Sequence, residues 1–513
     1  MSLLRNSGAG DAASNFGRPG GDDHHGRVAV IDIGSNSLRL VVYDTPARLP
    51  VPIFNEKADC GLARGLEKTG KLNPEGVEHA RNALARFIRL AQVMGVERME
   101  LVATAAVRDA ADGPKFVEEI ESTFGVTVQI PSGAEEARLA ALGLLSGVPD
   151  ADGLLGDLGG GSLDLIALDR GQFGANATLP LGHLRLPEAA GGNVAKAARR
   201  VDDMLAPHDW IKDAKGRTFF AVGGSWRTLA RIFIEQTKYP VHIIDGFTMS
   251  YSGACNFTDV IAGLSQNSLK QMKSVPRRRV ENLPFAAVAM RRLLDMARPA
   301  QVVFSGFGMR EGQMLKGLPE DIRRQDPLIA GCETLAERAG RFSLLGAEMR
   351  DWMAPLFPDE TPRQARLRYA ASLLSDIGWI EHPDYRARHS FFRVLRLPFA
   401  GLTHPDRAYL AKAVFIRYNG DPDEDFAAAP IGLLNDDDLR HAKAVGYALR
   451  LAHTVSGSAP ELIGKTALAP SGKILTLKLP VKGPDVFFGD AVERRLKTLA
   501  KSLGFDDCAF GDV

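Results

Sequence analysis

A short pattern that occurs twice constrains this chain most. Residues 31–40 read IDIGSNSLRL and residues 156–165 read GDLGGGSLDL, so both contain D-x-G-x-x-S-L-x-L. Three consecutive glycines within a strand-like apolar run are unfavourable for strand stability unless something approaches the backbone closely. The two aspartates, Asp32 and Asp157, lie 157 − 32 = 125 residues apart. A strand, a polar turn and a returning strand that recur in this way predict two similar α/β halves.

The segments around the two copies follow one order of predicted elements. Each copy is a strand with a hairpin partner, and helices of period 3.6 alternate with short buried strands after it. In the first half we predict strands at 27–34, 37–44, 99–106 and 126–130, and helices at 76–96, 113–125 and from 134. In the second half we predict a hairpin over 153–169 and strand-turn-helix units at 219–234 and 301–312.

The chain is too long for one hydrophobic core. We predict a disordered leader (1–26), an α/β domain I (27–138), an α/β domain II (139–325), a helical domain (326–435) and a small C-terminal α/β segment (436–513). Residues 331–353 and 363–379 have helical periodicity in the third region, and 472–480 followed by 490–504 restore strand and helix in the last. The leader is rich in Gly, Ser and Asp, which is typical of disorder.

Charge and cysteine content exclude several classes of protein. With 63 Lys+Arg against 62 Asp+Glu, the net charge of +1 gives no overall field that attracts a nucleic-acid duplex or an anionic membrane. The four cysteines form no C-x-x-C pair, which fits a reduced compartment. No apolar run has the length of a membrane helix and no signal peptide is recognisable, so we expect a cytoplasmic protein.

The repeated turn is chemically suited to a phosphate. Small residues after a strand expose successive backbone N–H groups to an anion, and a neighbouring aspartate can hold a divalent cation. Either copy alone could be a tight hairpin with an Asx turn. Two copies in matching contexts favour a phosphate chain clamped between two lobes. Further glycine turns at Gly223-Gly224-Ser225 and at 305–308 precede predicted helices, where simple packing is an equal alternative.

Together these motifs resemble a known family. IDIGSNSLRL, TAAVRDA, SGAEEARL, GDLGGGSLDL, LPLGHLRL and FSGFGMREG are similar to those of the exopolyphosphatase and guanosine pentaphosphate phosphatase family, within the acetate and sugar kinase, heat-shock chaperone and actin superfamily. The resemblance covers about residues 27–320. It implies two ribonuclease H-like (actin-like ATPase) domains in tandem, and a mostly α-helical, HD-like C-terminal domain.

The resemblance also implies a reaction and its residues. Water would attack the terminal phosphorus of polyphosphate, or of the 5′ chain of guanosine pentaphosphate, with Glu136 as the general base. Glu135 and Glu136 could equally serve the dipole of a helix first turn, and only one of them can point into the cleft. The phosphate cradle would consist of Gly34, Ser35, Asn36, Gly159, Gly160, Gly161 and Ser162.

Metal and arginine candidates complete the implied site. Asp32 and Asp157 would stand near Mg²⁺ or Mn²⁺, and Asp164 is a further candidate. The family pattern has glutamate at that last position, so direct metal contact by the shorter Asp164 is in doubt and a water bridge is the alternative. Arg108 matches a family arginine that faces phosphate, where a guanidinium fork suits the oxygens. Weaker channel candidates are Ser37, Arg185, Gly223, Gly224, Ser225 and Arg279.

The helical domain resembles the HD phosphohydrolase fold without its ligands. Ser375-Asp376 and His389-Ser390 stand where a histidine-aspartate pair would be needed, so we expect this domain to be catalytically empty. Its arginines could extend a polyanion track, support a subunit interface or simply be solvated.

The leading hypothesis is a metal-dependent exopolyphosphatase or guanosine pentaphosphate phosphatase, homodimeric by resemblance. The length of the C-terminal region favours polyphosphate, although both substrates present the same terminal anhydride, and any requirement for a monovalent cation is left open. One alternative is an ATP-dependent kinase of a sugar or carboxylate. Another is a non-catalytic sensor of polyphosphate or nucleotide.

Overall fold

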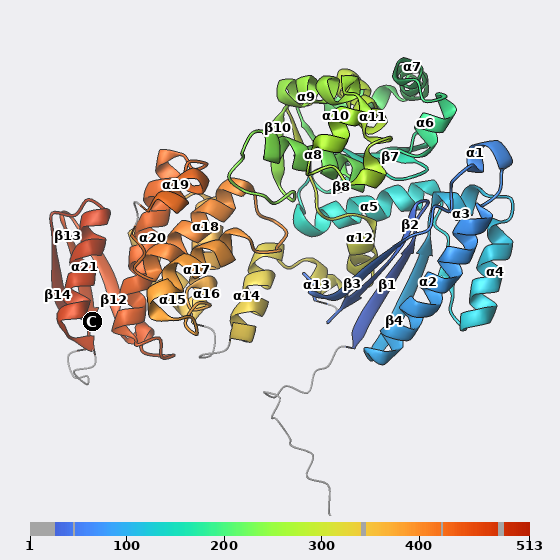
Figure 1. Ribbon diagram of the computed structural model, residues 1–513. Helices are drawn as coiled ribbons and strands as arrows, with labels where there is room; N and C mark the ends of the chain where they lie inside the picture. Colours follow the sequence, from blue (N-terminus) through green and yellow to red (C-terminus); the bar gives the residue numbers. More distant parts are fainter. Residues whose placement is uncertain (1–25, 45–46, 340–344, 422–423, 481–486) are drawn as a thin grey trace, which may run out of the picture.

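The structure is a computed structural model in which three globular parts follow one another along the chain (Figure 1). It describes residues 26–44, 47–339, 345–421, 424–480 and 487–513. Residues 1–25 of the predicted leader lie outside the described residues. Two α/β domains stand side by side, and a largely helical region extends away from them.

The first sheet is mixed, in the order β3-β2-β1-β4-β5. β1 pairs antiparallel with β2 and parallel with β4. Its strands are β1 (Arg27–Ile33), β2 (Ser37–Tyr43), β3 (Pro52–Asp59), β4 (Val96–Ala103) and β5 (Val128–Gln129). Its helices are α1 (Leu66–Thr69), α2 (Pro74–Val93), α3 (Ala105–Asp109) and α4 (Gly113–Phe124).

β1 is apolar on both faces because both faces are covered. Ile31 and its neighbours pack against Leu84 and Phe87 of α2. Val30 and Tyr43 pack on the other face against Met314, which comes from the far end of domain II. A strand buried on both sides therefore reads as a continuous apolar run rather than an alternating one.

The second sheet repeats this topology, in the order β10-β11-β9-β6-β7-β8. β6 pairs antiparallel with β7 and parallel with β9, as β1 does with β2 and β4. The strands are β6 (Gly153–Leu158), β7 (Leu163–Asp169), β8 (Gln172–Leu179), β9 (Thr218–Val222), β10 (Phe247–Ser250) and β11 (Gln301–Phe304). The helices are α6 (Arg185–Ala189), α7 (Val194–Leu205), η1 (Asp209–Ala214), α8 (Gly224–Gln236), α9 (Tyr251–Gly263), α10 (Gln266–Gln271), η2 (Arg277–Arg279) and α11 (Leu283–Ala297).

Two helices join the α/β domains. α5 (Gly133–Gly147) and α12 (Met309–Lys316) pack closely, since a Cβ on Gly312 would lie 1.8 Å from the carbonyl oxygen of Leu139. α12 then returns to the first sheet through Met314. The predicted boundary at 138/139 falls inside α5, and α12 packs with domain I although it was assigned to domain II. The sequence did not predict that α12 contacts α5 and the first sheet, because these segments lie far apart in the chain.

The C-terminal region is helical up to Val455. Its helices are α13 (Glu320–Arg323), α14 (Pro327–Ala339), α15 (Gly346–Met353), η3 (Ala354–Leu356), α16 (Pro362–Leu374), α17 (Pro383–Leu395), α18 (His404–Arg417), α19 (Asp425–Ile431), α20 (Asp436–Val455) and η4 (Ile463–Lys465). The final sheet, β12-β13-β14, consists of β12 (Ala467–Ser471), β13 (Ile474–Leu479) and β14 (Asp507–Asp512), with α21 (Asp490–Ser502).

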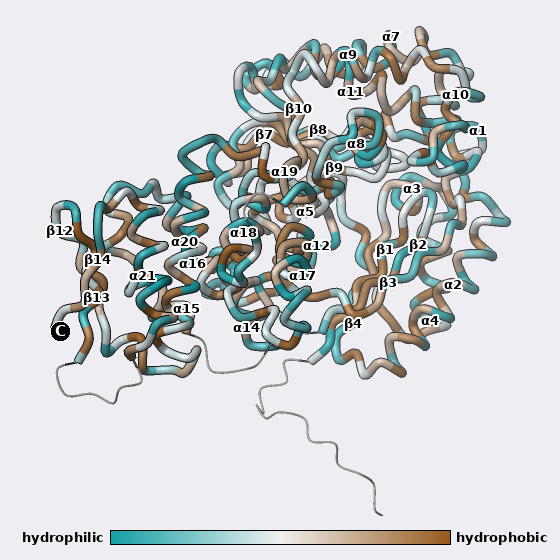
Figure 2. Tube along the Cα trace, turned by 60° about the vertical axis from the view of Figure 1, so that its left-hand side comes forward, coloured by the Kyte–Doolittle hydropathy of each residue, from teal (hydrophilic) through white to brown (hydrophobic). Residues whose placement is uncertain are grey.

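Two boundaries in this region differ from prediction. α20 packs against α18 of the helical region and against α21, and one hydrophobic core spans these helices and the final sheet, so residue 436 is not a boundary between two cores. The first strand of the small α/β unit begins at Ala467. Residues 331–353 contain parts of two helices, α14 and α15, rather than one. Hydrophobic residues concentrate along the strands of the first sheet, whereas the outer helices alternate in hydropathy (Figure 2). Within the described residues, no helix has both the length and the apolar character needed to cross a membrane.

Candidate phosphate cleft

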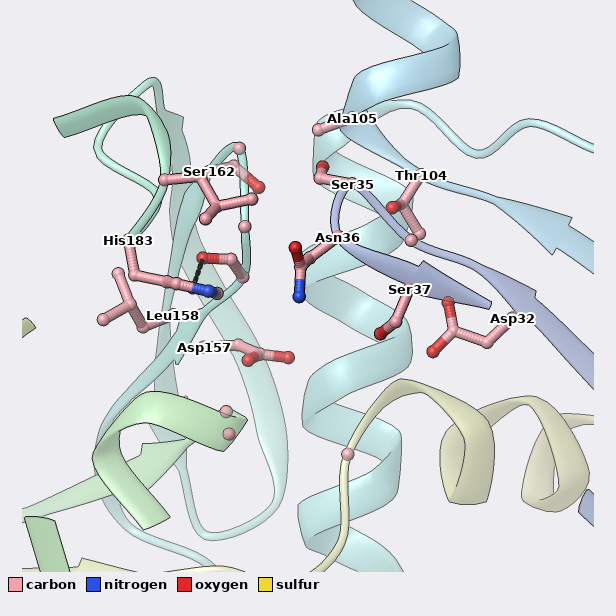
Figure 3. A pocket seen from close by; sticks show the side chains of 18 of the residues that line it. Asp32, Ser35, Asn36, Ser37, Thr104, Ala105, Asp157, Leu158, Ser162 and His183 are labelled. Carbon is pink, nitrogen blue, oxygen red and sulfur yellow. Dashed lines mark hydrogen bonds between the residues drawn. The ribbon is translucent and has the colours of Figure 1, made fainter. Parts of the chain in front are cut away.

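The two repeated hairpins face each other across one cavity of about 230 Å³. Figure 3 shows Asn36 and Asp157 directed into the space between the β1–β2 hairpin and the β6–β7 hairpin. The cavity brings together most predicted cradle and carboxylate residues: Asp32, Gly34, Ser35, Asn36, Ser37, Glu136, Asp157, Gly159, Gly160, Gly161, Ser162, Gly223, Gly224 and Arg279.

Both hairpins close with the same turn hydrogen bond. The Gly34 amide donates to the Ser37 carbonyl at 3.1 Å, and the Gly159 amide donates to the Ser162 carbonyl at 3.0 Å. The strand registers are also equivalent, because Asp32 stands opposite Arg39 and Asp157 stands opposite Asp164. The chain therefore makes one turn twice, and Arg39 occupies in the first copy the position of Asp164 in the second.

The glycines of the second turn are required by space more than by backbone angles, because their φ values are not positive. A Cβ on Gly160 would lie 2.8 Å from the Cβ of Ser35, and a Cβ on Gly161 would lie 3.2 Å from Ala105. The two hairpins thus touch across the domain boundary. Side chains here would push the lobes apart and widen the cradle.

Asp32 and Asp157 lie deep in the cleft, where their charges are opposed by burial. Burial raises the pKa of Asp157 to about 6; Arg227 opposes the increase and Asp32 adds to it. Burial likewise raises the pKa of Asp32, although Arg310, whose Nε lies 3.9 Å from Asp32 Oδ2, counteracts it.

The carboxylate pair suits a divalent cation only in part. A cation would relieve the mutual repulsion of Asp32 and Asp157, and phosphate oxygens with water could complete its coordination. Among the described residues, however, no group of three or more His, Cys, Asp or Glu side chains could hold a metal ion. The residues therefore fit a cation that arrives with phosphate.

Glu136 lines the cavity from the first turn of α5 and contacts Arg108. The Arg108 Nη1 donates to Glu136 Oε2 at 2.6 Å and to the Pro131 carbonyl at 3.1 Å. Burial raises the pKa of Glu136 to about 7, Arg108 opposes this, and Asp157 and Asp32 add to it. A carboxylate with a pKa near neutrality is suited to accept a proton from water.

Its neighbour Glu135 has a different task. Glu135 accepts from the amide and hydroxyl of Ser132, each at 2.8 Å, in a capping box that starts α5. The adjacent acids therefore divide as expected from helix geometry: Glu135 caps the helix and Glu136 faces the cavity.

Asp164 lies behind the cavity wall and does not line it. The Ser162 hydroxyl donates to Asp164 Oδ2 at 3.0 Å. Burial raises the pKa of Asp164 well above its usual value, and the Glu136 charge adds to this effect. In this arrangement Asp164 orients Ser162.

Three other predicted residues stand outside the cavity. Arg108 binds Glu136 from behind. Arg185 lies at the cleft rim, with its Nε 2.6 Å from Glu67 Oε2 and its Nη1 3.1 Å from Asp109 Oδ2. The Ser225 hydroxyl accepts from Arg279 Nη1 at 3.1 Å and so helps to hold that arginine against the cavity.

Sequence reasoning missed several basic residues that line the cavity. They are Arg39, Lys57, Arg227, Arg278 and Arg310, and the imidazole of His183 lines it as well. Burial, together with the charges of Arg310 and Arg227, lowers the pKa of Arg39 to about 10. Such crowding of positive charge predicts an anionic ligand. For Arg39, the signal was its place in the repeat, two residues after Ser37.

His183 supports the second hairpin. Its Nδ1 lies 2.7 Å from the Gly159 carbonyl, and its amide donates to that carbonyl at 3.0 Å. Burial lowers the pKa of His183 to about 4, so the ring is neutral near pH 7. It therefore positions the turn without adding charge.

The cleft continues into a second cavity of about 830 Å³. Asn36, Leu184, Arg278 and Asn282 line both cavities. A ligand longer than the first cavity could extend in this direction.

Arginines of the helical region are mostly engaged inside that region. Arg363 contacts Asp406 and Asp438, Arg368 contacts Glu360, and Asp376 contacts Arg417 at 3.0 Å. These pairs give little support to a polyanion track along these helices.

The fold and the cleft define a two-domain α/β protein with a cavity, lined by several arginines, between paired hairpins. Residues 40–321, more than half of the chain, match the Ppx/GppA phosphatase family, and residues 328–507 match the exopolyphosphatase C-terminal domain. The chain belongs to the Ppx/GppA phosphatase family. Its two mixed sheets and the largely helical region after them are the tandem α/β architecture that the sequence predicted.

Relatives carry different functions in their names. The chain is 25% identical to retrograde regulation protein 2 of Saccharomyces cerevisiae over 76% of its own length and 72% of the relative's. It is 29% identical to exopolyphosphatase 2 of Mycobacterium tuberculosis over 42% of its own length and 72% of the relative's. An exopolyphosphatase structure from Cytophaga hutchinsonii matches with a TM-score of 0.53 at 21% identity, over 57% of this chain and 99% of the other. That likeness concerns the fold alone.

Proposed function

We propose that this protein is an exopolyphosphatase that removes the terminal phosphate of inorganic polyphosphate by attack of water, and that it also accepts guanosine pentaphosphate. One observation carries the proposal: Glu136, with a pKa near 7, lines the cavity into which both phosphate-cradle hairpins point. A basic cavity with a poised carboxylate matches what phosphoanhydride hydrolysis needs.

Each hairpin contributes amides to the cradle. The turns at 34–37 and 159–162 would bind oxygens of the terminal and penultimate phosphates. Inside the low-dielectric cleft, three arginines would compensate the negative charge of the bound polyphosphate: Arg39, Arg227 and Arg310. Tight contact between the hairpins keeps these donors in place.

Glu136 would orient a water molecule and accept its proton as the new P–O bond forms. Arg108 keeps part of the Glu136 population ionised near neutral pH and fixes its direction. Asp32 and Asp157 would hold Mg²⁺ or Mn²⁺ together with phosphate oxygens, and that cation would stabilise charge on the departing phosphate.

The kinase alternative requires a second substrate whose hydroxyl or carboxylate replaces water. The sensor alternative has one supporting observation, because a relative is named as a regulatory protein. Both alternatives predict no orthophosphate release from polyphosphate. Homodimer formation, a cytoplasmic location and any need for a monovalent cation stay predictions.

The test measures orthophosphate release with Mg²⁺ or Mn²⁺ from long polyphosphate, tripolyphosphate, guanosine pentaphosphate and ATP. Glu136→Gln should lower kcat by about a hundredfold or more, the scale for loss of a general base. Glu135→Gln is the matched control: it changes an adjacent glutamate that caps the helix, and kcat should stay near that of the wild type. Absence of release from every substrate would refute the hydrolase, and equal activity in Glu136→Gln would refute the base.

A further inference from the structure

Asp245 lies outside the cleft but accepts a hydrogen bond from a turn that leads into it. The residue precedes β10, and its Oδ1 accepts from the Gly306 amide at 2.8 Å. Gly306 belongs to the turn between β11 and α12, the helix that presents Arg310 to Asp32. The carboxylate therefore extends the β10–β11 pairing onto the turn that leads into the cleft.

The same turn holds a cleft arginine. Arg227 Nη1 donates to the Gly306 carbonyl at 2.8 Å, and Arg227 Nε donates to the Gly223 carbonyl at 3.3 Å. Arg227 lines the cavity and lowers the pKa of Asp157. Since Gly306 accepts from Arg227 and donates to Asp245, one peptide turn joins the two side chains.

Asp245 also lies at the contact with the helical region. Next to it, Gly246 has φ +76°, and a Cβ there would lie 2.5 Å from the Leu402 carbonyl oxygen. The rings of Tyr239 and His404 are in contact, with centroids 5.4 Å apart and planes tilted by 45°. The domain II segment that carries Asp245 thus packs against the start of α18, in keeping with the neighbouring segments in Figure 1.

A buried arginine of the helical region interacts electrostatically with this carboxylate. Arg407 of α18 is 1% exposed and donates to the carbonyls of Leu397 and Phe399. Its Nε has no hydrogen-bond partner among the residues described. Its charge interacts with that of Asp245, and each charge favours the ionised form of the other. A buried cation without a full set of hydrogen bonds is costly unless a nearby anion compensates it.

We propose that Asp245 is a positioning residue through which the helical region, by way of Arg407, holds the Gly306 turn and Arg227 in the geometry that binds phosphate. This inference rests on the proposed phosphate cleft and gives the helical region a role in it. The helical region then contributes to substrate binding without contacting the substrate.

Two substitutions at Asp245 separate the hydrogen bond from the charge. Asp245→Ala removes the acceptor for the Gly306 amide, so we expect KM for long polyphosphate and the Kd for tripolyphosphate to rise about tenfold as Arg227 loses its support. Asp245→Asn keeps an acceptor oxygen, so binding should stay within about threefold of wild type. It also removes one of the two carboxylate charges, those of Asp245 and Asp406, that favour the ionised form of Arg407. Because burial raises the pKa of Asp245 to about 6, the same change relieves the cost of a buried carboxylate, so the coupling to Arg407 is measured by the double-mutant cycle and not by the single change in Tm.

A double-mutant cycle tests the link to Arg407. Arg407→Met should lower Tm in the wild-type background and lower it less in Asp245→Asn, because the charge interaction is then already absent. Asp326→Asn is the matched control: Asp326 pairs with Arg366, its Oδ2 2.6 Å from Arg366 Nε, at the start of the helical region and away from the cavity. It should change Tm with little effect on tripolyphosphate affinity.

Tripolyphosphate binding by calorimetry, in samples whose circular dichroism shows them folded, keeps this inference separate from turnover. If the wild type releases no phosphate but Asp245→Ala still weakens binding, the positioning role stands and the proposed hydrolysis fails. The positioning role is overturned if folded Asp245→Ala binds tripolyphosphate as tightly as the wild type. It is equally overturned if Asp245→Asn loses as much affinity as Asp245→Ala, or if the Tm effects of the cycle are additive.

Discussion

Arg108→Met should move the pH dependence of the reaction. Arg108 Nη1 lies 2.6 Å from Glu136 Oε2 and opposes the burial that raises the pKa of Glu136 to about 7. An opposite charge at this range lowers a carboxyl pKa by about 1 to 3 units, so its removal should move the Glu136 pKa to roughly 9. The active form is the ionised carboxylate. The rising limb of activity should therefore shift to higher pH.

The size of the effect follows from the ionised fraction. In the wild type, where the pKa of Glu136 is about 7, half of the carboxyl groups are ionised at pH 7. In Arg108→Met, where the pKa should be roughly 9, only about one hundredth are ionised. The value of kcat/KM at pH 7 should therefore fall about fiftyfold and recover near pH 9 to 10. The assay is orthophosphate release from polyphosphate between pH 5.5 and 10. Arg108→Lys keeps the charge and should shift the limb much less. A loss of activity that is equal at every pH, with the limb unmoved, would refute this reasoning and assign Arg108 to the substrate.

Three further predictions concern the cleft. Asp157→Asn should abolish turnover yet stabilise the ligand-free protein by about 1 to 3 kcal/mol at pH 7. The reason is that the pKa of Asp157 is near 6 in the folded protein and lower in the unfolded chain, so ionisation of Asp157 lowers stability as pH rises from about 4 to 6. A lower Tm than that of the wild type would contradict this prediction. Gly160→Ala places a Cβ 2.8 Å from Ser35 Cβ, so KM should rise about tenfold, whereas an unchanged KM would show that the hairpins need not touch. Removal of divalent cations with EDTA should stop phosphate release and added Mg²⁺ should restore it, and full activity in EDTA would contradict the role of Asp32 and Asp157.

The repeat made much of the fold predictable. Both copies of D-x-G-x-x-S-L-x-L form the same hairpin, with Asp32 and Asp157 at equivalent register positions, because a local turn and strand alternation are encoded within ten residues. The return of α12 to the first sheet was not predictable in this way. It depends on the close contact of α12 with α5 at Gly312, and no pattern in the sequence around that glycine predicts this contact.

The cradle was predictable, but its basic lining was only partly so. The residues that lie within recognisable sequence motifs line one cavity in the structure: Glu136, Asp32, Asp157 and the glycines of the two turns. Arg227 and Lys57 come from separate elements and meet there only through the tertiary fold. Arg108 was predicted to face phosphate and Asp164 was a metal candidate, but neither lines the cavity: Asp164 contacts Ser162 and Arg108 contacts Glu136. The spacing of residues along a strand or helix does not reveal how deep a side chain lies behind the cavity wall.

The most direct test of the account is hydrolysis of long-chain polyphosphate in H₂¹⁸O with Mg²⁺, with the released orthophosphate analysed by mass spectrometry. We expect one ¹⁸O atom in each phosphate released, because water attacks the terminal phosphorus, and we expect the signal to disappear in Glu136→Gln and persist in Glu135→Gln. No release of orthophosphate, or release that is independent of Glu136, would contradict hydrolysis of polyphosphate with Glu136 as the base.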